Sequence, residues 1–291
     1  MNGAMHGNAL LALLSAGFWG GGDFLGGMGV KRAGGSVSAA LRVILISHAV
    51  SLCVLMGFAA WEGDPFPHGA PLYWGLAAGV SAGASLVAFY VALNRGAMGI
   101  PAALSGLLAA ALPAVVSIWT DGRPSAKHVC GFLIAGVAIW LIAAGGDEEG
   151  SAGTIWLAAI AGAGFGVYFI ALKFAGEAGV VWPMANSRMG SLTICTLITL
   201  ALAIFSKRQE QVTINRGVLL WALATAVLDT TGNLMFVAAS RAGRLDVAAV
   251  LASLYPALTI LLAAWTLKER PTRRQGLGMA VAAGAVVLIT L

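Results

Sequence analysis

Asp229 and Asn233 are the chain's most distinctive pair of chemically capable residues, because they lie in the middle of an apolar stretch. An ionisable group in such surroundings is costly and marks a functional candidate. The two residues are four positions apart, so on a helix they share one face and could bind a cation or a substrate amine. The alternative is a structural Asp229, hydrogen-bonded or ion-paired with Arg42 or Arg188. We expect Asp229 to matter more for function than for folding.

A second carboxylate, Asp23, follows three glycines in the segment Trp19-Gly20-Gly21-Gly22-Asp23. Trp19 and Asp23 are one helical turn apart and are predicted to point the same way. Consecutive glycines weaken a helix, so this run predicts a local break whose backbone groups face a cavity. Close helix packing around small residues is the alternative explanation.

Other polar side chains in apolar stretches complete the candidate set. Tyrosine and asparagine offer hydrogen-bonding groups, and tyrosine adds an apolar face. His48 is expected to be a structural hydrogen-bonding residue, whereas Arg42 and Arg188 either extend to the membrane surface or bind a carboxylate. The predicted substrate-binding residues are Trp19, Asp23, Tyr90, Tyr168, Asn186, Asp229, Asn233 and Tyr255.

Motifs for other chemistry are missing from the sequence. There is no HExxH or Walker A pattern, and Cys53, Cys130 and Cys195 lack the CxxC or CxxH spacing of zinc ligands. We therefore expect no catalytic residues, no metal and no cofactor, and a protein that is not an enzyme. Because no ATP-binding motif is present, any energy that the protein uses would come from gradients, and proton coupling is an open alternative.

An intramembrane aspartyl protease is the competing hypothesis from another class. Gly20 to Asp23 fits the GxGD pattern, Pro256-Ala257-Leu258 spells PAL, and Asp229 offers a second carboxylate. In those proteases, however, the partner aspartate precedes GxGD on the neighbouring span, whereas here it follows far along the chain. A channel or scramblase is a third option, although no selectivity filter or ring of like charge is present.

The composition is that of a membrane protein. Hydrophobic residues make up 59% of the 291 residues and charged residues only 10%, against about 25% charged in soluble domains. The net charge of +5 does not indicate nucleic-acid binding, because Lys and Arg fall mostly in short gaps between apolar runs. A small-molecule substrate and the lipid bilayer are the expected partners.

Ten apolar runs approach the length of about 20 residues that a helix needs to cross a bilayer. The sequence therefore predicts an all-α membrane protein with ten transmembrane helices. The first run is expected to be a retained span, and Pro256 to kink the ninth. The runs are Ala9–Gly29, Ser36–Trp61, Pro71–Asn94, Gly99–Trp119, Lys127–Ala144, Ala152–Phe174, Val181–Phe205, Gly217–Ser240, Val247–Leu267 and Gln275–Leu291.

The two halves of the chain resemble each other. Tyr90–Thr120 aligns without gaps onto Phe236–Thr266. Its matches include Arg95 with Arg241, Trp119 with Trp265, and Thr120 with Thr266; Arg42 also pairs with Arg188. This predicts two five-helix repeats, residues 1–146 and 151–291, with the second inverted because each repeat has an odd number of spans.

The chain resembles the ten-span EamA branch of the drug/metabolite transporter superfamily. The repeat carries this resemblance, together with Phe18-Trp19-Gly20, Tyr255-Pro256-Ala257, Leu267-Lys268-Glu269-Arg270 and a glycine-rich last helix. It implies a secondary transporter or exporter of small metabolites, amino acids among them, in the inner (plasma) membrane. A monomer or weak dimer is expected.

The expected site is a midplane cavity lined by spans one, three, four, six, eight and nine, with spans five and ten at the periphery. The sequence does not decide on which side of the membrane the two termini lie. Eleven Lys and Arg beside odd-numbered loops against six beside even ones favour termini outside, whereas the family resemblance implies termini inside.

Overall fold

The computed structural model describes residues 2–95, 98–143, 152–206, 211–268 and 272–290, and within these ranges every regular element is helical. Among them, eight helical segments are long and apolar enough to cross a membrane, which confirms an all-α membrane protein. They are α1 (Asn2–Arg32), α2 (Val37–Glu62), α3 (Ala70–Leu93), α4 (Gly99–Thr120), α6 (Ala152–Ala175), α7 (Val181–Phe205), α8 (Arg216–Ala242) and the pair α9 (Leu245–Ala252) and α10 (Tyr255–Leu267).

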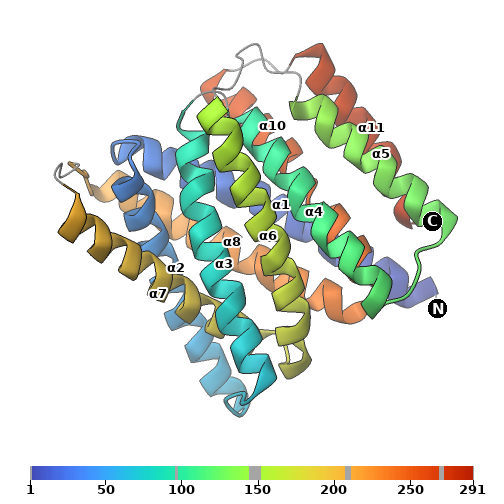
Figure 1. Ribbon diagram of the computed structural model, residues 1–291, viewed down its shortest axis with the longest axis horizontal. Coiled ribbons are helices and arrows are strands. Elements are labelled where there is room, and N and C mark those ends of the chain that lie inside the picture. Colours follow the sequence, from blue (N-terminus) through green and yellow to red (C-terminus); the bar gives the residue numbers. More distant parts are fainter. Residues whose placement is uncertain (1, 96–97, 144–151, 207–210, 269–271, 291) are drawn as a thin grey trace.

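The predicted fifth and tenth runs form two shorter helices. These are α5 (Ala126–Ala143) and α11 (Arg273–Thr290), 18 residues each. They pack mainly on each other at one side of the bundle (Figure 1). A short 3₁₀ turn, η1 (Gly176–Ala178), follows α6. The full count of ten spans stays a prediction.

The ninth predicted run is interrupted. Ser253 and Leu254 form a turn between α9 and α10, and Pro256 occupies the first turn of α10. Proline has no N–H for the helical ladder and is accepted at a helix start, so the expected kink becomes a break. The break begins α10 with Tyr255, whose side chain is turned into the bundle.

The predicted break at the three glycines of α1 is wrong, because α1 is continuous from Asn2 to Arg32. Gly20 instead lets α10 approach: a Cβ there would lie 2.6 Å from the carbonyl oxygen of Tyr255. Gly22 similarly faces the backbone of Asp229. These glycines therefore serve close packing, the alternative explanation.

Small residues also join α3 to α7. Gly75, Gly79 and Gly83 form one stripe on α3, and a Cβ at any of them would collide with α7. A Cβ at Gly190 of α7 would likewise collide with the backbone of Leu76 on α3. This stripe therefore serves an internal contact.

Packing joins the two halves of the sequence. α1 lies against α8, while α3 lies against α6 and α7. The predicted division between residues 146 and 151 falls outside the described residues, as does Glu269-Arg270. The division into two repeats stays a prediction.

Candidate functional site

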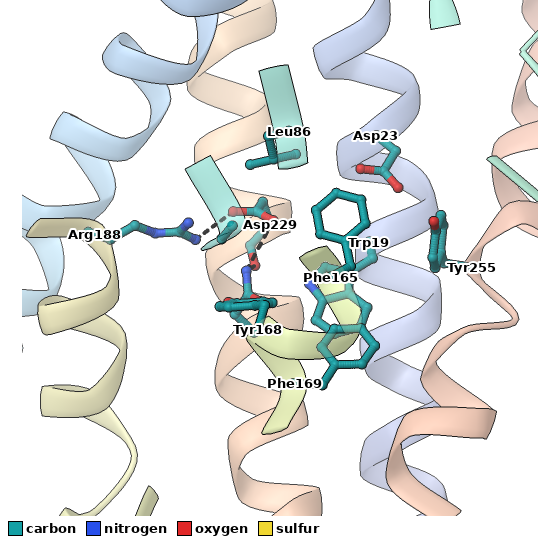
Figure 2. A pocket seen from close by; sticks show the side chains of 11 residues that line it. Trp19, Asp23, Leu86, Phe165, Tyr168, Phe169, Arg188, Asp229 and Tyr255 are labelled. Atoms are coloured by element: carbon teal, nitrogen blue, oxygen red, sulfur yellow. Dashed lines mark hydrogen bonds and ion pairs between the residues drawn. The ribbon is translucent and has the colours of Figure 1, made fainter. Parts of the chain in front are cut away.

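A cavity lies within the helix bundle. It is deep, because one of its lining residues, Asp229, stands thirteen residues from either end of α8, Arg216–Ala242. Figure 2 shows the cavity from close by. Its lining residues are Trp19, Asp23, Ala82, Leu86, Phe165, Tyr168, Phe169, Arg188, Asp229, Asn233 and Tyr255.

Six of the eight predicted residues line this cavity, all except Tyr90 and Asn186. The contributing helices are α1, α3, α6, α7, α8 and α10. Two of these details differ from the prediction. α7 contributes Arg188, whereas no residue of α4 is among the lining residues.

Arg188 organises the polar wall. The residue is 1% exposed, and its side chain donates three hydrogen bonds: from Nε to Ser51 Oγ at 3.0 Å, from Nη1 to His48 Nε2 at 2.8 Å and from Nη2 to Asp229 Oδ2 at 2.5 Å. A buried guanidinium requires such partners. His48 is itself held by Ser191, with 2.7 Å between Nδ1 and Oγ.

Asp229 is bound from its other side by Asn233. The Asn233 amide donates to Asp229 Oδ1 at 3.0 Å, as their spacing in the sequence suggested, and Tyr168 donates its hydroxyl to Asn233 Oδ1 at 2.5 Å. A continuous chain of hydrogen bonds thus runs from α7 through α8 to α6. The ion pair with Arg188 was the structural alternative for Asp229, and the same carboxylate lines the cavity.

An aromatic cluster forms another part of the wall. Trp19 stacks on Phe169 with ring centroids 5.0 Å apart and an interplanar angle of 3°, and Phe236 lies 5.4 Å from Trp19. Gly232 makes room for the indole, since a Cβ there would lie 2.7 Å from the Trp19 ring. The cluster gives a bound solute a large apolar surface.

Asp23 differs from Asp229 in its surroundings. It lines the cavity, yet no hydrogen bond or ion pair joins it to any residue in the described part of the chain. Figure 2 shows its carboxylate on the side of the cavity near Tyr255, away from the Arg188–Asp229 pair. An aspartyl protease needs two carboxylates that share a proton, but the Asp229 oxygens are taken by Arg188 and Asn233.

Tyr90 and Asn186 lie elsewhere. The Tyr90 hydroxyl packs against Gly26 of α1. Asn186 is fully buried where α7 meets Gly75 of α3, and its amide atoms have no hydrogen-bond partner among the described residues. Neither belongs to the set that lines the cavity.

The sequence missed several lining residues. Ala82, Leu86, Phe165 and Phe169 are apolar residues in apolar helices, so no local signal separates them from ordinary core residues. Arg188 was predicted to extend to the membrane surface, to bind a carboxylate or to pair with Asp229, and it was not among the predicted substrate-binding residues. A basic residue within an apolar run was nevertheless a usable signal.

An ionic cluster connects several helix ends at the side of the bundle where α6 ends, and Lys173 lies in the last turn of α6. Asp121, just after α4, accepts the N–H of Leu245 at 2.8 Å and the hydroxyl of Ser117 at 2.8 Å, and lies 3.3 Å from the Lys173 ammonium. Lys173 also donates to the carbonyl oxygen of Ser240 at 3.0 Å. Burial raises the pKa of Asp121, but these hydrogen bonds and the Lys173 charge outweigh it and hold the pKa below its ordinary value.

Arg244 reinforces the same cluster. It pairs with the fully buried Asp246 at 2.6 Å and donates to the carbonyl oxygens of Asp121 and Gly122, each at 2.8 Å. The hydrogen bond with Asp246 raises the pKa of the Arg244 guanidinium, against the effect of burial. The end of α4, the end of α6 and the α8–α9 connection are therefore fastened to one another.

Comparison with known proteins agrees with this architecture. A solved crystal structure, described only as that of a protein, matches with a TM-score of 0.72 at 15% identity, over 99% of this chain and 96% of that chain; at this identity the likeness concerns the fold alone. No curated protein sequence matches the chain. The family model described as the EamA-like transporter family matches residues 152–291. This match confirms, over the second half of this multi-pass membrane protein, the family resemblance seen in the sequence.

Proposed function

We propose that this protein is a secondary transporter that moves small amphipathic solutes across a membrane by alternating access at the cavity between the helices. The observation that carries the proposal is the cavity itself. It lies at the middle of α8, and both halves of the chain contribute residues to it.

The lining supports a small amphipathic solute. Arg188, Asp229 and Asn233 supply polar groups, while Trp19 and Phe169 supply apolar surface. A largely apolar wall with a few polar groups that converge on it is the usual form of a small-molecule site. Amino acids and similar metabolites, the class that the family resemblance implies, are of this kind, and export across the plasma (inner) membrane is the expected direction.

The ionic cluster around Asp121 is a candidate for the contact that closes one end of the bundle during alternating access. Phe169 lines the cavity and Lys173 stands one turn further along α6, so the cluster lies beyond the aromatic wall. Opening this end of the bundle requires Lys173 and Arg244 to leave their partners around Asp121. We infer that the transport cycle breaks and remakes these contacts.

Uptake into proteoliposomes, with and without an imposed pH gradient, tests the proposal. Leu86→Trp fills the cavity from α3 and should abolish uptake of any solute that the wild-type protein carries. Val80→Trp is the matched control, because Val80 is on the same helix but faces outward, 42% exposed. Both variants should elute as folded protein.

The pH gradient separates coupled from uncoupled transport, and either result agrees with a secondary transporter. Equal uptake by Leu86→Trp and Val80→Trp would contradict the proposed route. Wild-type vesicles that carry no member of a broad metabolite panel would contradict the function.

A further inference from the structure

We propose that the transported solute is an organic cation, an amine or quaternary ammonium on an apolar body, and that Asp23 is its counter-ion. This inference rests on the proposed function and names its substrate class. The observation behind it is a carboxyl group that has no hydrogen-bond or ion-pair partner among the described residues. It lies in an aromatic cavity whose other two ionisable side chains pair with each other.

The charge of the cavity is the first argument. Its lining holds three side chains that carry charge: Arg188, Asp229 and Asp23. The first two form an ion pair at 2.5 Å, so Asp23 is the ionisable lining side chain that has no partner of opposite charge among the described residues. The charged form of a carboxyl inside a helix bundle is costly when no cation is near, and a cationic ligand supplies such a partner.

The second argument is that the guanidinium of Arg188 is already occupied, which disfavours solutes that carry a carboxylate. Its guanidinium is committed to Ser51, His48 and Asp229. A substrate carboxylate would have to compete with Asp229 for that guanidinium and would enter a cavity that also holds Asp23. Anions are therefore disfavoured, and a zwitterion gains less than an amine that lacks the carboxylate.

The aromatic lining is the third argument. Trp19 stands one turn from Asp23 on α1, and Phe165 and Tyr255 line the same cavity. Aromatic faces attract ammonium groups, and sites for quaternary ammonium ligands are built from them. Tyr255 is held in place through its hydroxyl, 2.7 Å from Ser105 Oγ.

Binding to the purified wild-type protein in detergent tests this class directly. The probes share one phenyl body and differ in charge: phenethylammonium and its trimethylated form, 2-phenylethanol, phenylacetate and phenylalanine. Isothermal titration should show the two cations binding tightest. Asp23→Asn should weaken cation binding by about 10- to 100-fold, as expected for loss of a charged hydrogen-bonding partner. Asp64→Asn, which removes an exposed carboxylate outside the cavity, should bind like wild type.

Phenylalanine or phenylacetate binding as tightly as the cations would overturn the inference, as would unchanged cation binding by Asp23→Asn. The wild-type panel decides the substrate class even if Asp23→Asn does not fold, and Asp23→Ser is a second route to the same comparison. Proteoliposomes that carry the zwitterion or the anion but not the trimethylated cation would refute the substrate class and leave the transporter standing. Vesicles that carry none of the probes and no other metabolite would refute both.

Discussion

Arg188 and Arg42 hold matching positions in the sequence repeat, but their side chains have opposite surroundings. Arg42 is exposed on α2, whereas Arg188 is buried against Asp229. In the alignment of Tyr90 with Phe236, the residue that corresponds to Asp229 is Gly83. A buried guanidinium needs an anion, and the first half has none at the matching place. The arginine of the first half therefore stays at the surface.

At this scale we expect Asp229→Asn to destabilise the fold. The change leaves Arg188 buried without its ionic partner, and breaking a buried pair costs about 3–5 kcal/mol. Thermal unfolding of the purified protein in detergent measures the effect as a lower midpoint. Arg42→Met is the control and should unfold near the wild-type midpoint, because Arg42 is exposed.

An Asp229→Asn protein with the wild-type midpoint and no uptake would contradict this and support the expectation drawn from the sequence, that Asp229 matters more for transport than for folding. Loss of both stability and uptake would assign both roles to this carboxylate.

Spacing predicted the polar part of the cavity better than residue type did. Asp229 with Asn233, and Trp19 with Asp23, share helix faces because they are four positions apart, and all four line the cavity. Asn186 has suitable chemistry, but its position on α7 turns it toward α3. The rotation of a helix about its axis depends on the helices that pack around it. A single sequence therefore does not specify which face of α7 is turned toward the cavity.

At the scale of the element, α1 and the α9–α10 pair show why Pro256 was easier to interpret than Gly20. Proline lacks an N–H wherever it stands, so a disturbance at Pro256 could be expected from the sequence alone. The role of a glycine depends on what lies opposite. Gly20 lies against the carbonyl oxygen of Tyr255, and that contact exists only in the folded bundle.

Gly20→Ala should therefore separate α1 from α10. Its Cβ would meet backbone at 2.6 Å, and overpacking of this kind costs about 1–3 kcal/mol. Gly17→Ala is the matched control on the same helix, because nothing lies within 4 Å of its Cβ. Unfolding midpoints should fall for the first variant and not for the second. Equal midpoints would contradict the prediction and show that α10 can shift away from α1 at little cost in stability.

The contact of Asp121 with α9 should weaken in acid. The pKa of Asp121 is lower in the folded protein than its ordinary value of about 3.9. Its stabilising effect is therefore complete above that value and is lost as the pH falls through the lowered pKa. The difference in unfolding midpoint between wild type and Asp121→Asn should be constant from about pH 7 to 5 and shrink below about pH 4. A difference that persists unchanged at pH 3 would contradict this account.

At the scale of the whole molecule, several helix contacts respect the sequence repeat: where two helices pack together, their equivalents in the other half also pack together. The contact of α1 with α8 has its counterpart in α6 with α3, and that of α4 with α6 has its counterpart in α9 and α10 with α1. α2 packs against α7, which is its equivalent in the second half, and α5 packs against its equivalent α11. This pattern supports the predicted repeat, whose inversion stays a prediction.

Inversion places equivalent residues at opposite membrane surfaces. Leu245 at the start of α9 bonds Asp121 at the end of α4, so these neighbouring spans run in opposite directions. Their equivalent tryptophans, Trp119 and Trp265, are 76% and 83% exposed near the two helix ends, where aromatic residues favour the membrane interface.

Cysteine labelling in sealed vesicles tests this topology. Cys53 and Cys130, which are exposed, are first replaced by alanine. Arg123→Cys, beyond the end of α4, and Lys268→Cys, beyond the end of α10, are then introduced singly; both positions are exposed. A membrane-impermeant maleimide should label one variant in right-side-out vesicles and the other in inverted vesicles, because α4 and α10 end on opposite sides. The side on which Lys268→Cys reacts also decides between the two orientations. Labelling of both variants from one side would rule out the inverted repeat.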